Sequence, residues 1–540
     1  MSTNISKLKR DDLLNKINQI HTYIANAPQD ENTGNLLTYL SELEKDVNGK
    51  KYGLVFEEHR EKIDETLEEN TPVLSEEKDL FIDNGGEMNF LIEGDNLASL
   101  KLLEKTHRGK IDIIYIDPPY NTNKKDFIYD DTFIDNNDCY RHSKWISFLI
   151  QRLKISRNLL SQDGIIFISI DDNEQAVLRM LSDSVFGENN FIANMVWQKK
   201  KGGSNDSRHV ATEHEYILMY SKNKELLNNI FISYGESYIS RYKEEDDKGR
   251  FFWDTFKRKS GKQYYAITCP DGTVLEKDKN GEPISWLRSE KRFLSDLADG
   301  EARIIKINGK WTVHFKQRQP AGYKPRSIIT EYGTTSDGAA ELKNLFNLSN
   351  VFSNPKPIKL IEYLLKFKKE KQITILDFFA GSGTTGHAVL KLNNEDGGNR
   401  KFILCTNNEN NICRDVTYER IKRVIEKEEY NASLKYYKVD YVPISDRMYY
   451  EYADELLEHI RELVELENGV NFTGNKEIAI VLTEEELDQF IADIDNFSSC
   501  KKIYMGHDLL PSEEQESAIR AREIEINIIP DYYYKDLQEG

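Results

Sequence analysis

The sequence predicts an α/β protein built on a doubly wound sheet of mainly parallel strands. Two apolar runs rich in isoleucine carry this prediction, Ile111–Ile116 and Ile373–Phe379. The first run ends at two prolines, and the second ends at a glycine loop that leads into a helical pattern. Short apolar runs that stop at turn residues are typical of strands buried on both faces of a parallel sheet. Because ligands of such open sheets bind at the carboxyl ends of the strands, we expect the functional residues directly after both runs.

The chain of 540 residues divides by composition into five segments. Two polar helical patterns open the chain, and the first half of the sheet pattern follows. Gly-rich turns with short aromatic strands come next. The second half of the sheet pattern then follows, and an acidic tail comes last. The predicted boundaries are 1–50 for a helical arm, 51–221 and 346–435 for the halves of the sheet, 222–345 for the insertion, and 436–540 for a small acidic α/β module. Asp172 and Gln175 predict a capping box for the helix that follows the strand Gly164–Ile170.

The tetrapeptide Asp117-Pro118-Pro119-Tyr120 follows the first apolar run. Its prolines force the chain out of the strand ladder and leave a carboxylate, a carbonyl and an aromatic face together. Hydrogen bonds accepted by Asp117 and the Pro118 carbonyl would localise the lone pair of an aromatic amine, which is otherwise delocalised into the ring. Tyr120 offers a flat surface to a base that has left its duplex. The alternative interpretation is a tight Pro-Pro turn with a surface tyrosine.

The second run ends in the loop Ala380-Gly381-Ser382-Gly383-Thr384-Thr385-Gly386. Its glycines allow a ligand to approach the backbone closely, and the helix N-terminus after them presents free N–H groups to a carboxylate or phosphate. The three glycines also satisfy the G-x-G-x-x-G pattern of dinucleotide enzymes, so a nucleotide-dependent dehydrogenase has to be weighed. That pattern expects an acid about 20 residues later. Here the next strand pattern ends at Thr406-Asn407-Asn408, with Glu409 just beyond it.

In this order, the two motifs resemble those of the β-class amino-methyltransferases of DNA, which use S-adenosylmethionine. Within that class, five stretches resemble the modification (Mod) subunit of type III restriction-modification systems, over about residues 50–430. These stretches are Ile92-Glu93-Gly94-Asp95-Asn96-Leu97, Ile114 to Thr122, His214-Glu215-Tyr216-Ile217-Leu218, Asn354-Pro355-Lys356-Pro357 and Gly386-His387-Ala388-Val389-Leu390. The resemblance implies a Rossmann-like methyltransferase domain whose catalytic half is 51–221 and whose cofactor-binding half is 346–435, with target recognition in 222–345.

The resemblance also assigns roles to individual residues. The catalytic residues would be Asp117, Pro118, Pro119 and Tyr120. The cofactor-binding residues would be Asp95, Asp117, Asn354, Lys356, Pro357, Asp377, Phe378, Phe379, Ala380, Gly381, Ser382, Gly383, Thr384 and Asn407. Three alternatives stay open: Asp95 as the N-cap of the helix from Leu97 to Leu103, Asn354–Pro357 as a Pro-rich helix start, and Glu409 in place of Asn407 at the ribose.

Charge is distributed unevenly along a chain whose net charge is −19. Residues 197–326 hold 26 Lys and Arg against 18 Asp and Glu, whereas residues 441–540 hold 8 against 24. A local basic patch is enough for phosphate contacts, so the first of these segments is the candidate DNA surface and the acidic tail favours a protein partner. The candidate DNA-binding residues are Lys199, Lys200, Lys201, Arg208, Lys257, Arg258 and Lys259. The alternative is a solvated basic face.

The sequence therefore predicts a site-specific methyltransferase acting on the N6 amine of adenine in double-stranded DNA. Methylation of cytosine N4 and a DNA-recognition subunit without catalysis remain alternatives. The resemblance implies a separate helicase-nuclease restriction subunit as partner, and a homodimer. Five scattered cysteines without a C-x-x-C pair predict no metal site. No apolar stretch approaches the roughly 20 residues of a membrane helix and no signal-peptide pattern opens the chain, so we expect a cytoplasmic protein without a membrane partner.

Overall fold

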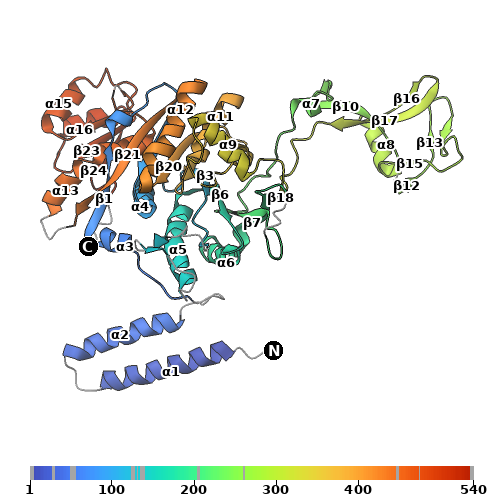
Figure 1. Cartoon of the computed structure of the whole chain (residues 1–540). Coiled ribbons are helices and arrows are strands. Elements are labelled where there is room, and N and C mark those ends of the chain that lie inside the picture. Colours follow the sequence, from blue (N-terminus) through green and yellow to red (C-terminus); the bar gives the residue numbers. More distant parts are fainter. Residues whose placement is uncertain are drawn as a thin grey trace. The chain divides into compact units, whose positions relative to one another are not determined.

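The computed structural model describes residues 5–26, 31–48, 56–122, 128–129, 132–133, 140–202, 207–259, 262–444, 449–473 and 475–534 (Figure 1). The chain forms two compact units. The sheet unit comprises residues 1–227, 328–359 and 372–540, and the inserted unit comprises residues 228–327 and 360–371. The inserted unit thus falls within the segment 222–345 and adds a short piece of chain from beyond it.

A mixed sheet of ten strands forms the centre of the sheet unit. In spatial order its strands are β1 (Asn70–Glu76), β21 (Ala432–Pro443), β2 (Glu87–Glu93), β20 (Lys401–Thr406), β19 (Thr374–Asp377), β3 (Ile111–Ile116), β6 (Leu160–Ile170), β8 (His214–Ser221), β7 (Phe191–Gln198) and β18 (Ile328–Ile329). The six strands from β21 to β6 run parallel, and β1 and β8 run antiparallel to their neighbours. The two apolar runs of the sequence are the adjacent strands β3 and β19, as the fold prediction required.

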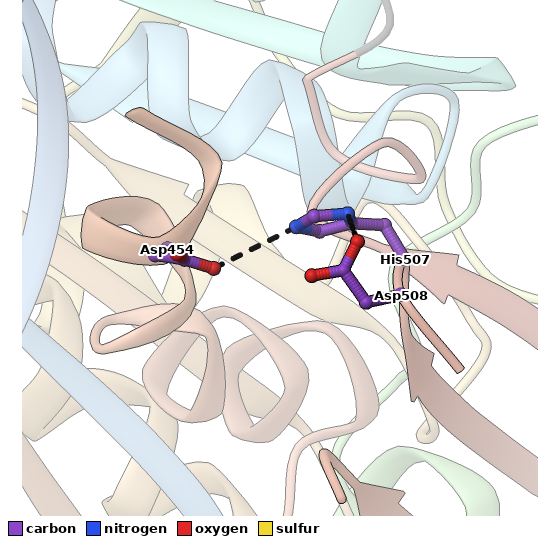
Figure 2. A group of neighbouring side chains, drawn as sticks. All are labelled: Asp454, His507 and Asp508. Atoms are coloured by element: carbon purple, nitrogen blue, oxygen red, sulfur yellow. Dashed lines mark ion pairs between the residues drawn. The ribbon is translucent and has the colours of Figure 1, made fainter. Parts of the chain in front are cut away.

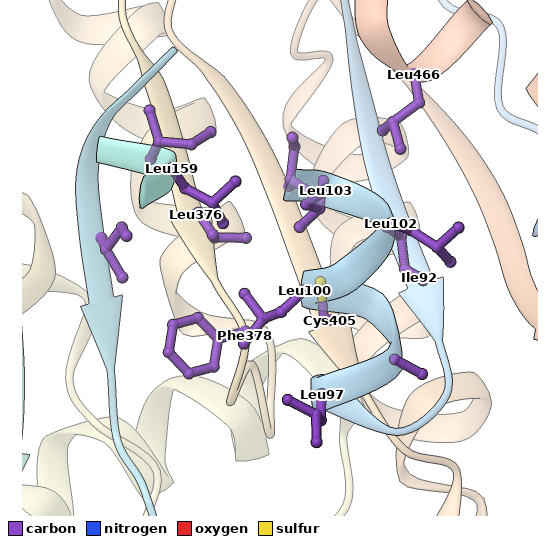
Figure 3. Close-up of a cluster of buried hydrophobic side chains, with 14 of the residues drawn as sticks. Ile92, Leu97, Leu100, Leu102, Leu103, Leu159, Leu376, Phe378, Cys405 and Leu466 are labelled. Carbon is purple, nitrogen blue, oxygen red and sulfur yellow. The ribbon is translucent and has the colours of Figure 1, made fainter. Parts of the chain in front are cut away.

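Helices cover both faces of this sheet, which makes it doubly wound. On one face, α4 (Asn96–His107), α5 (Arg141–Leu159) and α6 (Gln175–Phe186) share a buried core with alternate residues of the strands, such as Ile114 and Ile116. On the other face, α11 (Thr384–Asp396) packs at Gly386 against Phe402 and Leu404 of β20 and against α12 (Glu419–Glu428). Figure 3 shows the first of these cores, where Leu100 of α4 lies toward Phe378, the residue after β19.

The acidic tail forms the small α/β module that the sequence predicts. Its parallel strands are β22 (Ile478–Val481), β23 (Lys502–Gly506) and β24 (Glu525–Ile529), and its helices are α15 (Glu484–Ala492) and α16 (Glu513–Arg520). Two helices precede it, α13 (Tyr449–Leu457) and α14 (Ile460–Asn468). Tyr504, Ile529 and Tyr534 join the same core as α4 and α14, so the module is part of the sheet unit.

The inserted unit is built from antiparallel strands around an aromatic core. Its larger sheet has the order β16 (Ala302–Ile307), β17 (Lys310–Arg318), β10 (Gly249–Thr255) and β9 (Glu244–Asp246). A smaller sheet joins β11 (Lys257–Arg258), β15 (Ser285–Trp286) and β12 (Gln263–Tyr264), a hairpin joins β13 (Ile267–Thr268) to β14 (Val274–Leu275), and the helices are α7 (Glu236–Ile239) and α8 (Glu290–Ala298). Phe256, Trp286, Phe293 and Phe315 are buried together, so several aromatics of this segment serve the core rather than a surface.

The remaining elements are short or peripheral. They are α1 (Ile5–Asn26) and α2 (Glu31–Asn48) of the N-terminal segment, α3 (Lys62–Glu69), β4 (Ile128–Tyr129), β5 (Thr132–Phe133), α9 (Thr335–Phe346) and α10 (Ile358–Leu365), with single helical turns at 78–80, 188–190 and 409–411 and a π-helical segment Ile412–Tyr418. No helix within the described ranges combines the length and the apolar character needed to cross a membrane. Cys269, Cys405, Cys413 and Cys500 are buried free thiols, and Cys139 lies outside the described residues.

The predicted capping box at Asp172 is wrong. Helix α6 begins at Gln175 with Glu174 as its N-cap, and no side chain caps it. Asp172 instead accepts a hydrogen bond from the Tyr216 hydroxyl at 3.0 Å. The pattern misled because the helix starts later than the carboxylate spacing suggests, and because β8 brings a competing donor to Asp172.

Candidate active site

A cleft of about 1470 Å³ opens at the carboxyl ends of the central strands. Residues at or just after the ends of β2, β3, β19, β20 and β6 line it, together with the amino end of the antiparallel strand β8. Its lining includes all four residues of the Asp117–Tyr120 motif as well as Phe378, Phe379 and Gly381 of the second motif. The strand order thus brings the two motifs to one cleft, because β3 and β19 are hydrogen-bonded neighbours.

Asp117 and Tyr120 are held by a lysine from the Asn354–Pro357 segment. The Lys356 ammonium donates to Asp117 Oδ2 at 2.5 Å and to the Tyr120 hydroxyl at 3.0 Å. The same hydroxyl donates to Asp117 Oδ1 at 2.6 Å. Lys356 is 8% exposed. The Asp117–Tyr120 motif is therefore an ordered cluster, and the tyrosine is not the surface residue of a plain turn.

A second carboxylate and a second lysine complete this cluster. Glu215, at the start of β8, lies 3.5 Å from the Lys356 ammonium and accepts from Lys199 at 3.0 Å. Burial by itself raises the pKa of Glu215, but Lys356 and Lys199 outweigh it and lower that pKa. Burial likewise lowers the pKa of Lys356, but Asp117 and Glu215 outweigh it and raise that pKa. Glu215 and Lys356 thus stay charged and stabilise each other.

Hydrogen bonds from neighbouring elements anchor the backbone of the Asp117–Tyr120 motif. The Trp145 indole of α5 donates to the Pro119 carbonyl at 2.7 Å. Asn121 has a left-handed backbone with φ of +55°, and its side chain donates to Glu174 at 2.6 Å. Glu174 is fully buried, and His142 lies 2.6 Å from the same carboxylate oxygen. These bonds fix the turn that follows Pro119, so the motif is positioned before any ligand arrives.

The glycine loop after β19 has little room for side chains. Gly381 has φ of +49°, and a Cβ there would lie 3.1 Å from the Phe352 ring. Gly383 has φ of +74°, and a Cβ there would lie 3.2 Å from Thr417. Asp377 closes the loop by accepting from the Phe379 amide at 3.0 Å and from the Thr385 hydroxyl at 2.5 Å. The tight loop lets its backbone, rather than side chains, face a ligand.

Only some of the remaining predicted cofactor residues line the same cleft. Asp95 caps α4 by accepting from the Leu97 amide at 2.7 Å, and it also lines the cleft, so its capping role and a ligand role are compatible. Asn354, Asn407 and Glu409 line the cleft as well. Pro357 lies against Gly333, while Ala380, Ser382 and Thr384 lie behind the loop surface and are buried.

Of the predicted DNA-binding residues, the structure brings only part together. Lys199 and Lys200 line the cleft, and Lys199 is engaged by Glu215. Lys201 and Arg208 are exposed on the sheet unit. Lys257, Arg258 and Lys259 belong to the inserted unit, where Arg258 donates to the Thr255 carbonyl at 2.8 Å.

Sequence reasoning missed several residues of the cleft. Glu215 lies in a stretch that carries the family resemblance, but nothing in that stretch pointed to an ion pair with Lys356. Arg152 is fully buried, pairs with Glu61 at 2.7 Å and donates to Asn96 at 2.5 Å, and both partners line the cleft. No sequence signal marks this pair, because its members come from α5 and from the segment before α3.

One group of potential metal ligands lies apart from the cleft lining. His507 meets Asp508 at Nδ1 (2.8 Å) and Asp454 at Nε2 (3.8 Å), as Figure 2 shows. The two carboxylates face different ring nitrogens, which is the arrangement of two ion pairs rather than of one ion with three ligands. We assign no metal to these residues.

Comparison with known proteins finds similar sequences among Mod subunits and type II methyltransferases. The Mod subunit of the type III restriction-modification enzyme StyLTI from Salmonella typhimurium is 35% identical over 387 residues, covering 64% of this chain and 57% of that protein. The type II methyltransferase M.KpnI from Klebsiella pneumoniae is 33% identical over 341 residues, covering 58% of this chain and 79% of that protein. The chain thus spans little more than half the length of the Mod subunit it matches.

A solved DNA modification methylase from Thermus thermophilus, complexed with S-adenosylmethionine, is 14% identical with a TM-score of 0.33, covering 64% of this chain and 99% of that one. A family model described as DNA methylase matches residues 111–419, from the start of β3 to the start of α12. The matched residues make up more than half of the 540 and include both motifs. The chain therefore belongs to the DNA methylase family.

Proposed function

We propose that this chain is a site-specific DNA methyltransferase that transfers a methyl group from S-adenosylmethionine to the N6 amine of an adenine extruded from double-stranded DNA. One observation carries the proposal: the Asp117–Tyr120 cluster and the glycine loop line the same cleft. A methyl donor and an acceptor amine must meet there at bonding distance. The identity to a Mod subunit supports a role as the modification subunit of a restriction-modification system.

The residues of the cleft fit S-adenosylmethionine. Gly383 is the N-cap of α11, and a glycine has no side chain to accept from the amides of the first turn. Those amides and the helix dipole suit the cofactor's carboxylate. Asp95, Asn407 and Glu409 supply acceptors for its amine and hydroxyl groups at the other side of the loop. When bound, S-adenosylmethionine supplies an electrophilic methyl group.

The chain's own residues hold the acceptor amine. A carboxylate oxygen has two lone pairs, so Asp117 can accept from an amine while Lys356 and Tyr120 keep it in place. The Pro118 carbonyl accepts the second N–H, and the Tyr120 ring supports the base. The amine nitrogen gains positive charge as it is alkylated, which the Asp117 carboxylate stabilises before the proton leaves. No base has to remove that proton before attack.

Lys356 has two effects in this arrangement. Its raised pKa keeps it protonated, so it fixes the orientation of the Asp117 carboxylate before the base enters. Its charge is balanced by Glu215 as well as by Asp117, so the amine is not faced by an uncompensated cation. We propose that Lys356 acts on the catalytic motif in this way, in addition to bordering the cofactor site.

The test is methyl transfer to duplex DNA by purified Asp117→Ala. Loss of a preorganised electrostatic contact typically lowers turnover by about a hundredfold or more, so we expect almost no transfer and a fold unchanged by circular dichroism. Asp163→Ala is the matched control, because Asp163 lies near the amino end of β6, at the opposite edge of the sheet. Undiminished transfer by Asp117→Ala contradicts the proposal.

Further measurements decide the finer points. Mass spectrometry of the methylated nucleosides separates adenine N6 from cytosine N4 as the target. Calorimetric titration with S-adenosylmethionine separates an enzyme from a DNA-recognition subunit without catalysis, because only the enzyme needs the cofactor. We also propose a homodimer and a separate restriction subunit; sedimentation of the chain alone and with a co-expressed helicase-nuclease checks both.

The basic residues outside the cluster are proposed to contact DNA phosphates. Lys200 lines the cleft, Lys201 and Arg208 are exposed and follow β7, and Lys257 and Lys259 lie on the inserted unit. Replacing one phosphate contact by alanine should weaken binding to all sequences and reduce the salt dependence of the affinity by about one ion. An unchanged salt slope removes that residue from the interface.

A further inference from the structure

Arg420 of α12 lies fully buried behind the glycine loop. Its guanidinium donates to the Ser382 carbonyl at 3.2 Å, to the Ser382 hydroxyl at 3.1 Å and to the Thr384 hydroxyl at 2.8 Å. Its Nε donates to His387 Nδ1 at 3.3 Å. Three of its partners thus belong to the loop or to the first residue of α11. The guanidinium holds the turn from the side away from the cleft.

The charge of Arg420 has no carboxylate beside it. Its acceptors are two hydroxyls, a carbonyl and an imidazole, and no ion pair links it to an acid among the described parts of the chain. Burial lowers the pKa of Arg420 to about 10, and the carboxyl of Glu341, which forms no ion pair with it, offsets this only in part. A buried cation that forms no ion pair with an acid is unfavourable, because burial removes the hydration that would stabilise its charge.

His387 cannot share this charge. Burial and the neighbouring Arg420 lower the pKa of His387 well below its usual value, so the imidazole is neutral and its Nδ1 accepts the hydrogen bond. The positive charge therefore stays on Arg420. This charge lies beside the N-terminus of α11, which no side chain caps and where the helix dipole is also positive.

We infer that Arg420 is a positioning residue of the cofactor site whose charge is compensated by the carboxylate of the cofactor's amino-acid part. This inference rests on the proposed function, since it presupposes a cofactor with such a carboxylate. The loop backbone separates the guanidinium from the cleft, so Arg420 acts on the carboxylate electrostatically and without a direct contact. The structure thus assigns the anion-binding strength of this loop to a buried arginine as well as to its backbone amides.

A purely structural role makes a different prediction. Thr384 accepts from Arg420 and donates to the Lys356 carbonyl at 3.3 Å, and the Lys356 ammonium reaches Asp117. If Arg420 only braced this chain of contacts, its loss would weaken all ligands of the cleft alike. If its charge serves the carboxylate, only ligands with that group should suffer.

The experiment compares two probes that differ in this group. S-adenosylhomocysteine contains the amino-acid carboxylate, and methylthioadenosine keeps the thioether and nucleoside but lacks the amino acid. Calorimetric titration of the full chain measures both affinities for wild type, Arg420→Met and Arg420→Lys. Arg423→Met is the matched control, because Arg423 lies on the same helix and pairs with Glu419 instead of the loop.

We expect Arg420→Met to bind S-adenosylhomocysteine about tenfold more weakly, because the carboxylate loses its Coulombic attraction to a buried charge, and methylthioadenosine within about twofold of wild type. Arg420→Lys keeps the positive charge and should keep more than half of the wild-type affinity for S-adenosylhomocysteine. Arg423→Met should change the affinity for neither probe. An equal loss of both probes, or no loss of either, overturns the inference. Should Arg420→Met fail to fold, Arg420→Lys decides, since a structural role predicts an equal loss of both probes in it. Failure of wild type to bind S-adenosylhomocysteine would instead refute the proposed function.

Discussion

Loss of the Lys356 charge is expected to lower the free energy of unfolding, because Lys356 pairs with two carboxylates of the cleft. Lys356→Met keeps the length of the side chain but leaves Asp117 and Glu215 close together without their shared cation. Removal of one partner of a buried ion pair costs about 3–5 kcal/mol. The Asp117 side chain is 28% exposed and can recover some hydration, so we expect the lower end, about 3 kcal/mol.

The assay is urea unfolding followed by circular dichroism, with a double-mutant cycle between Lys356 and Glu215. Glu215→Gln alone removes the partner of Lys199 and should also destabilise the protein. The double variant should cost at least about 1 kcal/mol less than the two single costs together, because each single variant leaves a charge that the other removes. Lys359→Met, three residues along on the exposed side of α10, is the control and should change stability by less than about 0.5 kcal/mol. Additive costs, or an unchanged stability of Lys356→Met, would refute the reasoning.

Two further predictions concern residues around β19 and α11. Burial raises the pKa of Asp377 from 3.8 to about 7. Between these two pH values the folded chain keeps a proton that the unfolded chain has already lost. The stabilisation from this proton is therefore complete below pH 3.8 and is lost as the pH rises to about 7. Asp377→Asn should flatten this decline, which amounts to about 4 kcal/mol, and an unchanged slope of unfolding free energy against pH would contradict it. Gly386→Ala places a Cβ 2.8 Å from Ile421 and should destabilise by about 1–3 kcal/mol in thermal unfolding. Gly34→Ala, in an open helical position, should instead be neutral or stabilising, and equal effects of the two would exclude packing as the cause.

Local patterns were sufficient to predict the strands that support the cleft. Ile111–Ile116 and Thr374–Asp377 are largely apolar and end at prolines or glycines, so each stretch of sequence contains the information for its own structure. The edge of the sheet that binds ligands followed from the same patterns, since the two motifs stand at the carboxyl ends of parallel strands. The acidic tail was predictable for the same reason, because its strands and helices alternate clearly.

The contacts within the cleft were not predictable in this way. Lys356 and Asp117 are 239 residues apart, and they meet because Thr384, which follows β19, holds the Lys356 carbonyl, while Asp117 follows the neighbouring strand β3. Glu215 reaches the cluster because β8 runs antiparallel to β6, which puts its amino end at the edge where the parallel strands finish. Strand order and direction depend on the whole fold, so no spacing in the sequence reports them. The same applies to Arg420, which in the sequence is one more basic residue of an amphipathic helix.

The order of the strands also bears on how this protein is made. Asp112 of β3 accepts a hydrogen bond from the amide of Thr374, the first residue of β19, which lies 262 residues later. Both strands that neighbour β2 also come after the inserted unit in the sequence. At about 5–20 residues per second, a ribosome needs roughly 13–50 s to extend the chain from β3 to β19. During that interval the nascent chain presents open, apolar strand edges, which are templates for aggregation. Newly made chains should therefore depend on chaperones, and fragments that stop before β19 should be insoluble.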